Sequence, residues 1–216
     1  SDNVMNAVCA VEAAKADHSE VLVCMHETES DDFCVLHRGT RVRKNHTSRR
    51  NAFDTVGAKP IGRVEWKTDN VSFRREIAGR GEGTDDLAAG LETGVELVKF
   101  VPGTGTAFLD AANGASGIIL EGTGLGHVNT EWIDELEKLV DDGTTVVMTS
   151  QCLEGRVCDR VYDTGRDLLE AGVVEAGDTL PATAYVKLMW ALENTENPAD
   201  TMGRSLAGEL QDRSVP

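Results

Sequence analysis

Residues 95–150 read VELVKFVPGTGTAFLDAANGASGIILEGTGLGHVNTEWIDELEKLVDDGTTVVMTS. Short runs of apolar and β-branched residues alternate here with segments of helical composition, which is the pattern of consecutive βαβ units. Parallel strands need such crossover connections, so the stretch predicts an α/β fold with a parallel sheet. The expected elements, in chain order, are strand 95–101, helix 104–114, strand 116–122, helix 129–143 and strand 144–150.

The helix expected at 129–143 has the clearest periodicity in the chain. Its apolar residues fall on one face, as in a helix that packs against a sheet. Asn129 or Thr130 is placed to cap its first turn, and Gly143 is placed to end it. The apolar face consists of Trp132, Leu136, Leu139 and Val140.

Three further helices are expected downstream of this stretch. Residues 164–172 and 180–193 have helical composition, and the second segment has Pro181 at the position where proline favours a helix start. The last helix is expected to span 198–210. These segments complete a carboxyl-terminal domain over 95–216.

The amino-terminal part predicts one helix followed by strands. Apolar residues at positions 4, 8 and 11 recur at helical spacing behind a cap at Asp2 or Asn3, and they predict the buried face of a first helix. A strand at 20–26 has the composition of a buried strand in a parallel sheet. Further strands are expected at 31–39, 60–66 and 70–76, the last two as an antiparallel pair around the turn 67–70.

Residues 77–94 are rich in glycine and acidic residues, and we interpret them as a linker. The expected organisation is therefore an amino-terminal domain over 1–78, a linker over 79–94 and the carboxyl-terminal domain over 95–216. The sequence begins at Ser1 without an initiator methionine, directly at the cap of the first helix, and we expect the chain to be a fragment of a longer protein.

The composition narrows the classes of function. The 216 residues include 37 acidic and 21 basic ones, for a net charge of -16. This balance disfavours general binding to nucleic acids or to anionic membranes, and it suits a protein from a salt-adapted host. No apolar run is long enough to span a bilayer, so a cytoplasmic protein is expected. Neither a disulfide framework nor a metal site is expected from the spacing of Cys9, Cys24, Cys34, Cys152 and Cys158.

A basic segment between His37 and Arg50 interrupts this acidic chain. It reads HRGTRVRKNHTSRR and contains six of the 21 Lys and Arg residues. Its one lysine, Lys44, is surrounded by cations that would favour the neutral amine, a form suited to proton transfer. The alternative is a solvated loop whose charges offset acidic neighbours, and the spacing alone favours that alternative.

Four loops lie at the carboxyl ends of expected strands, where open parallel sheets bind ligands: those after His26, after Gly39, and after the strands 116–122 and 144–150. The last two of these loops carry motifs that can be compared with known sites. The first of these two, GTGLGH at 122–127, differs from the GxGxxG spacing of dinucleotide sites, and a structural turn is the favoured interpretation. The second begins TSQ at 149–151. Ser150 lacks the GxSxG elbow, so its simpler role is to hydrogen-bond the loop backbone.

Three separated segments together carry a family pattern. They are RVRKNHTSRRNAFDT at 41–55, TSQCLEGRVCDRVYDTGRDLL at 149–169 and LPATAYVKLMWALE at 180–193. With these segments in this order, the chain resembles the L-asparaginase family, and within it the branch of archaeal glutamyl-tRNA(Gln) amidotransferase subunits. The resemblance implies a two-domain asparaginase-like α/β architecture with parallel sheets, in which the amino-terminal domain is incomplete.

The resemblance implies one catalytic residue in this chain, Lys44. Family members hydrolyse a side-chain amide with a threonine nucleophile that a second threonine, an aspartate and a lysine assist. The threonines and the aspartate belong to motifs of the GGTIA and HGTDT kind, and neither motif occurs here. The stretch GTDD at 83–86 is rejected because it follows Lys44, whereas the family order places these residues upstream. Ser1 and Asp2 would end an SSDRPSSD-like segment, in keeping with a fragment.

A homodimer is also implied, with the loop 155–162 of one protomer near the active site of its partner. Tyr162 stands where bacterial asparaginases carry a glutamate, and His127 stands where they carry an asparagine. We therefore assign no catalytic role to Tyr162 and consider His127 only as a contact.

The implied function is that of a glutaminase-type amide hydrolase. Ammonia released from glutamine would be used by a partner protein, the E subunit of the amidotransferase, to convert glutamyl-tRNA(Gln) to glutaminyl-tRNA(Gln). No cofactor is expected in this chain, because ATP and magnesium would act on that partner, and tRNA would be met only through the complex. The alternatives are a free-standing L-asparaginase and a noncatalytic α/β ligand-binding domain, and the fragment itself is expected to be inactive.

Overall fold

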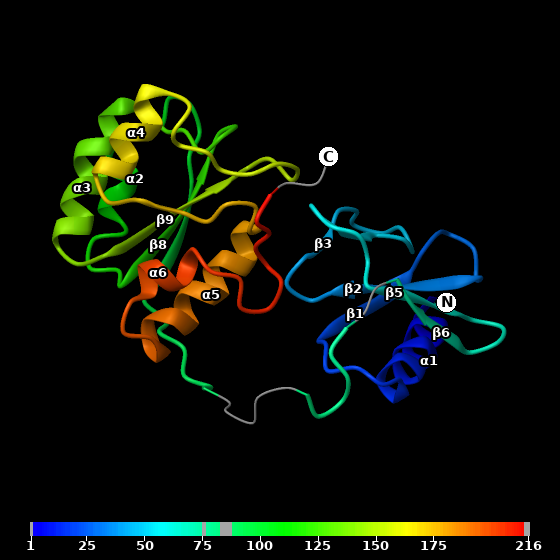
Figure 1. Cartoon of the computed structure of the whole chain (residues 1–216). Coiled ribbons are helices and arrows are strands. Elements are labelled where there is room, and N and C mark those ends of the chain that lie inside the picture. Colours follow the sequence, from blue (N-terminus) through cyan, green and yellow to red (C-terminus); the bar gives the residue numbers. More distant parts are fainter. Residues whose placement is uncertain (1, 75–76, 83–87, 214–216) are drawn as a thin grey trace. The chain divides into compact units, whose positions relative to one another are not determined.

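The chain folds into two compact units, Ser1–Leu87 and Ala88–Pro216 (Figure 1). The structure is a computed structural model, and it describes residues 2–74, 77–82 and 88–213. The first unit contains β1 to β6 and helix α1, and the second contains β7 to β10 and helices α2 to α6.

The second unit is built on a parallel sheet with strand order β10-β9-β8-β7. Strand β8 pairs with β7 from Val95↔Gly117 to Lys99↔Glu121, and with β9 from Gly117↔Thr145 to Gly122↔Ser150. The βαβαβ prediction is thus confirmed. The strands are β7 (Val95–Lys99), β8 (Gly117–Gly122), β9 (Thr145–Ser150) and β10 (Val174–Glu175).

Helices cover both faces of this sheet (Figure 1). Successive residues of a strand point to opposite faces. Ile118 and Leu120 accordingly pack with Leu136 of α3 and Leu168 of α4, whereas Ile119 packs on the other side with the apolar residues of α5 and α6. This double burial explains why β8 is apolar at consecutive positions instead of alternate ones. The helices are α2 (Ala107–Asp110), α3 (Ile133–Asp141), α4 (Asp163–Glu170), α5 (Pro181–Asn194) and α6 (Pro198–Met202).

Helix α3 matches its predicted apolar face but not its predicted start. Trp132, Leu136 and Leu139 are buried, and Gly143 adopts a φ of 98° just after the helix. A 3-10 turn, η1 (Thr130–Trp132), precedes the helix, and within the described residues no side-chain hydrogen bond caps either element. The Trp132 indole instead donates to the carbonyl of Thr104 at 3.1 Å, so tertiary packing fixes this end.

The last helix is shorter than the sequence predicts. Helix α5 begins at Pro181 as expected, but α6 ends at Met202 and not at Leu210. The residues that follow are held by tertiary contacts: the amides of Leu206 and Ala207 donate to the carboxylate of Glu209. These contacts replace the intrahelical hydrogen bonds that a longer helix would make.

The first unit contains an antiparallel sheet of order β1-β2-β5-β6. The pairing of β5 with β6 confirms the predicted antiparallel pair. We expected residues 20–26 to form a strand of a parallel sheet. This prediction is wrong, because β1 pairs with β2 antiparallel from Leu22↔Arg38 to His26↔Cys34. Only a short connection joins these two strands, and it cannot hold the crossover that parallel strands need. The strands are β1 (Leu22–His26), β2 (Phe33–Arg38), β5 (Gly62–Glu65) and β6 (Asn70–Phe73), with a separate hairpin of β3 (Val42–Lys44) and β4 (Phe53–Thr55).

Helix α1 (Asp2–Lys15) packs on this sheet with a different face from the predicted one. The buried residues are Met5, Cys9 and Ala13, which pack with Cys34, Leu36 and Val64 of the sheet. The predicted face is exposed: Val4 is 60%, Val8 38% and Val11 59% accessible. Both series recur at helical spacing, and the small Cys9 and Ala13 allow the closer approach to the strands. In the described part of the chain, no helix has the length and apolar character needed to cross a membrane.

Candidate functional site

Lys44, the predicted catalytic residue, lies at the end of β3 in the β3–β4 hairpin. It is opposite Phe53 in the register, and its ammonium nitrogen lies 5.7 Å from the centre of the Phe53 ring. The side chain is exposed to solvent. The hairpin therefore presents the amine at its surface, near the aromatic ring of its cross-strand neighbour.

The residue after Lys44 closes the hairpin. The Asn45 amide donates to the carbonyl of Ala52 at 2.7 Å, and its side-chain nitrogen donates to Asp54 at 3.0 Å. Within the enclosed loop, His46 Nδ1 accepts hydrogen bonds from the amides of Ser48 and Arg49 at 3.1 and 2.9 Å. These contacts give the loop after β3 a defined shape, so the backbone at Lys44 is fixed from both sides.

Arginines of the basic segment pair with acidic residues. Arg50 donates to Asp31 at 2.6 Å, and Arg38 forms a two-point contact with Glu20. A hydrogen bond from His26, together with Arg50, lowers the pKa of Asp31. The interpretation that the positive charges of this segment offset acidic neighbours is confirmed for these two arginines.

His37 is a polar core residue that the sequence did not single out. It lies on β2, is 3% exposed, and its Nδ1 is 2.9 Å from the hydroxyl of Thr55 on β4. Burial lowers its pKa to about 4, and the opposing charge of Asp54 only partly offsets that effect. The imidazole is therefore neutral at physiological pH, and it links the β3–β4 hairpin to the main sheet.

In the second unit, the loops after β8 and β9 meet. Thr123 and His127 form an isolated bridge, with Gly124 and Gly126 at positive φ values of 55° and 112° between them. The loop GTGLGH is thus a tight turn, as the sequence favoured. The His127 ring packs edge-on against Tyr162 with ring centres 5.2 Å apart. Tyr162, which belongs to the loop that the resemblance places near a neighbouring active site, thus lies against His127, which we considered only as a contact.

The polar residues after β9 are engaged within the unit. Ser150 donates from its hydroxyl to the carbonyl of Gly124 at 2.6 Å and accepts from the Cys152 amide at 3.0 Å. The Gln151 side chain donates to the carbonyl of Glu121 at 2.8 Å. The structural role expected for Ser150 is confirmed.

Asp159 is a buried acid that sequence reasoning missed. The residue is 0% exposed, and within the described ranges neither carboxylate oxygen has a hydrogen-bond partner. Burial, reinforced by the negative charge of Glu175, raises its pKa to about 7. Gly165 of α4 packs so tightly on the Asp159 backbone that a Cβ atom there would overlap its carbonyl oxygen. No motif marks this residue, because an aspartate in a polar loop is usually solvated.

Asp159 should make stability fall as the pH rises. The carboxyl stays protonated in the folded chain up to about pH 7 but ionises in the unfolded chain near its ordinary pKa of 3.8, so stability is lost between these values. Asp159→Asn should remove this loss, which is on the order of 4 kcal/mol between pH 4 and pH 8. Urea unfolding measured across this range tests it. Asp163→Asn, at an exposed carboxylate, is the control, and identical pH profiles for Asp159→Asn and the unmodified chain would contradict the assignment.

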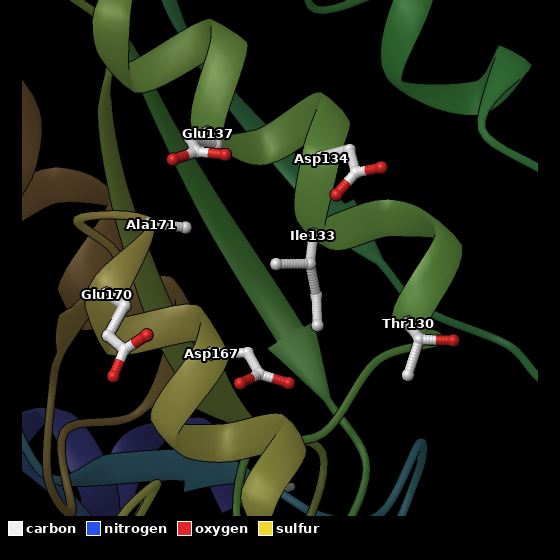
Figure 2. Close-up of a pocket in the computed structure, with 7 residues that line it drawn as sticks. All are labelled: Thr130, Ile133, Asp134, Glu137, Asp167, Glu170 and Ala171. Carbon is white, nitrogen blue, oxygen red and sulfur yellow. The ribbon is translucent and has the colours of Figure 1, made fainter.

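A groove with a volume of about 360 Å³ lies between α3 and α4, and Figure 2 shows the residues that line it. Its carboxylates repel one another in dilute buffer. In the described part of the chain, no group of His, Cys, Asp or Glu residues has the arrangement of a metal site. The lining residues are Thr130, Ile133, Asp134, Glu137, Asp167, Glu170 and Ala171.

Fold and loops together define a two-unit α/β protein of the asparaginase type. Residues 94–202 match the family model for the glutaminase/asparaginase C-terminal domain, and residues 1–78 match that for the asparaginase N-terminal domain. The chain therefore belongs to the glutaminase/asparaginase family. The resemblance and the asparaginase-like α/β fold class are confirmed. The sheet of the second unit is parallel as expected, whereas the four-stranded sheet of the first unit is antiparallel.

Individual relatives show which members of the family this chain is similar to. The chain is 63% identical to the D subunit of the glutamyl-tRNA(Gln) amidotransferase of Halobacterium salinarum, and 51% identical to that of Methanosarcina mazei. These alignments cover 100% and 98% of this chain but only 53% and 51% of the relatives, so the chain spans about half their length. The structure of the thermostable L-asparaginase from Thermococcus kodakarensis is also similar, with a TM-score of 0.85 and 31% identity over 97% of this chain and 63% of that one.

Two site predictions are not tested by the structure. The catalytic assignment of Lys44 stays a prediction, because its expected threonine and aspartate partners belong to motifs that this sequence does not contain. The rejected stretch at 83–86 lies outside the described residues. The structure does bring His127 and Tyr162 together, and it places the carboxylate of Asp159 against Gly126, the residue before His127.

Proposed function

We propose that this chain is part of a glutaminase-type D subunit of an archaeal glutamyl-tRNA(Gln) amidotransferase. The observation that carries the proposal is 63% identity over the whole chain to a protein of that name. The activity would be hydrolysis of the glutamine side-chain amide. The ammonia would pass to the E subunit as partner, on which ATP and magnesium act, and tRNA would be engaged through the complex in the cytoplasm.

Lys44 is the residue of this chain that we assign to the chemistry. In the proposed reaction a threonine oxygen loses its proton and attacks the amide carbon. The amide nitrogen takes up a proton and leaves as ammonia, and water then cleaves the acyl ester to give glutamate. As a neutral amine, Lys44 would take the threonine proton and pass it to the leaving nitrogen. The exposed position of its side chain at the end of β3, held by Asn45 and the loop behind it, supports this assignment.

A homodimer is part of the same proposal. The loop 155–162 would face the active site of a second copy, as the family resemblance implies. Two exposed apolar side chains support a contact there: Val161 is 54% and Tyr162 56% accessible. Exposed apolar groups of this kind mark interaction surfaces when they cluster.

The test is ammonia release by the full-length protein. Glutamine should be hydrolysed, and most rapidly when the E subunit and the tRNA are present. A second candidate is a free-standing L-asparaginase, which the similarity to the Thermococcus kodakarensis enzyme favours. Preference for asparagine without any partner would establish that candidate, and no amidase activity in either assay would leave a noncatalytic ligand-binding domain.

The 216-residue chain by itself should be inactive. Its lysine lacks the GGTIA-type and HGTDT-type motifs that would supply the nucleophile. Turnover of glutamine by the isolated chain, measured as ammonia release above that of a heat-unfolded sample, would contradict both the fragment interpretation and the assignment of Lys44.

Salt should stabilise the chain if it comes from a salt-adapted host, as its charge of -16 suggests. Raising KCl from 0.1 to 2 M screens carboxylate repulsion and should raise the melting temperature by roughly 5 °C or more. Removing two charges from the groove between α3 and α4, by Asp134→Asn with Asp167→Asn, should reduce this rise. Asp69→Asn with Asp110→Asn is the matched control outside the groove, and a melting temperature independent of salt would contradict the proposal.

A further inference from the structure

The residues after α6 form a carboxyl-terminal tail (residues 203–213) that a buried ion pair anchors. The Lys187 ammonium on α5 lies 2.8 Å from Glu209, and their side chains are 6% and 2% exposed. Lys187 also donates to the carbonyl of Met202 at 3.1 Å and to that of Arg204. A charged pair with this many hydrogen bonds is geometrically restrictive, so the tail has a fixed position on the second unit.

The far end of the tail meets one side chain of the loop that follows β9. Arg156 donates to the carbonyl oxygens of Asp212 at 2.9 Å and Gln211 at 3.3 Å. On the tail side, the Gln211 amide donates to Asp178 at 2.9 Å. Arg156 therefore joins the tail to the loop through charge-assisted hydrogen bonds, which are stronger than neutral ones.

Glycine at position 177 makes room for this junction. Its φ is +59°, and a Cβ atom there would lie 2.5 Å from Leu210 and 3.0 Å from the Arg156 guanidinium. The same residue receives the loop, since the Val157 amide donates to the Gly177 carbonyl at 2.9 Å. Tail, loop and the turn after β10 thus converge on one point.

Beyond Arg156, the next three residues of the loop, 157–159, each donate a hydrogen bond from the backbone amide. The Cys158 amide donates to the carbonyl of Leu125 at 2.9 Å, and the Asp159 amide donates to the Glu175 carboxylate at 2.8 Å. Three residues later the loop reaches Tyr162, whose ring packs against His127. Arg156 is the first of these consecutive attachments and the one that depends on the tail.

We propose that Arg156 is a positioning residue, and that through it the carboxyl-terminal tail holds the loop 155–162, and with it Tyr162, in the arrangement that serves glutamine binding. The part of this proposal that concerns glutamine rests on the proposed function. The part that concerns the loop rests on the contacts of Arg156, Lys187 and Glu209 alone. Arg156 itself need not touch the substrate, because it acts through the backbone of the residues that follow it.

Hydrogen exchange of the 216-residue chain tests the structural part. Arg156→Gln should speed amide exchange in 157–162 by about 10- to 100-fold, the change expected when charge-assisted hydrogen bonds that order a segment are lost. Exchange in β8 and β9 should stay unchanged. Arg156→Lys keeps a cationic donor and should recover part of the protection. Arg166→Gln, at an exposed arginine of α4 that pairs with Asp163, is the matched control.

Kinetics of the full-length protein test the functional part. Arg156→Gln should raise KM for glutamine by about 10-fold with kcat nearly unchanged, because a binding contact that is equal in ground and transition states is weakened. The KM of Arg156→Lys should lie between the KM of the unmodified protein and that of Arg156→Gln. A chain that ends at Leu210 removes both carbonyl acceptors without altering the loop, and it should reproduce the Arg156→Gln exchange and KM.

The results of these experiments distinguish the positioning role of Arg156 from its link to glutamine binding. Unchanged exchange in 157–162 for both Arg156→Gln and the shortened chain would overturn the positioning role, as would an equal increase throughout the second unit. Faster exchange with an unchanged KM would overturn the link to glutamine. A full-length protein without any amidase activity would overturn the proposed function, while the exchange experiment would still decide the role of Arg156.

Discussion

Lys44→Met in the full-length protein is expected to lower the rate of glutamine hydrolysis by about 10²- to 10⁴-fold, the range lost when a side chain that transfers protons is removed. Methionine retains most of the length of the side chain and removes only the amine, which lies 5.7 Å from the centre of the Phe53 ring. The backbone pairing of Lys44 with Phe53 does not depend on the side chain. The loss should therefore appear in kcat with the fold intact, as measured by ammonia release and circular dichroism.

Two further variants test whether proton transfer is the role of Lys44. Lys44→Arg keeps the positive charge but cannot supply a neutral amine, so it should be nearly as inactive as Lys44→Met if proton transfer is the role. Lys67→Met makes the same substitution in the turn between β5 and β6 and should leave the activity unchanged. Retention of more than about one tenth of the activity by Lys44→Met would contradict the assignment.

Lys187→Met is expected to lower the free energy of unfolding of the second unit by about 3–5 kcal/mol, because it leaves the charge of Glu209 buried without its partner. Burial alone would raise the pKa of Glu209, but the Lys187 ammonium and the amides of Leu206 and Ala207 lower it. The carboxylate is thus ionised at neutral pH in the folded chain. Urea unfolding at pH 7, followed by circular dichroism, measures the loss.

A double replacement separates the cost of the lone charge from the value of the pair. Lys187→Met with Glu209→Leu removes both charges, so the part of the loss that the lone charge causes should be recovered. The hydrogen bonds that Glu209 accepts from the amides of Leu206 and Ala207 stay lost, so recovery should be incomplete. Lys138→Met breaks an exposed pair with Glu135 and should change stability little. If Lys187→Met unfolded at the same urea concentration as the unmodified chain, the pair would not anchor the tail.

The second unit could be predicted from sequence because its central strands have neighbours on both sides and are covered on both faces. Residues 118–120 are apolar in succession for that reason, and the helices between the strands show a clear period. The errors arose where tertiary contacts override local pattern. The last helix ends at Met202 because the Glu209 carboxylate accepts hydrogen bonds from amides that a longer helix would use. Helix α1 buries Cys9 and Ala13 instead of its valines.

The candidate site was predictable only in part. Lys44 was found through the family resemblance, since its spacing alone favoured a solvated loop. Asp159 and Arg156 gave no signal, because a polar residue in a loop shows its burial or its partners only once distant segments are placed beside it. Residues 156 and 212 are 56 positions apart, and no periodicity connects them.

The fit of Gly165 against Asp159 has a mechanical consequence. Because the backbone of Asp159 lies directly against Gly165, the loop cannot move toward helix α4 at this point without displacing it. An opening movement of the loop at Asp159 is therefore directed away from α4 and can occur while the helix stays packed on the sheet.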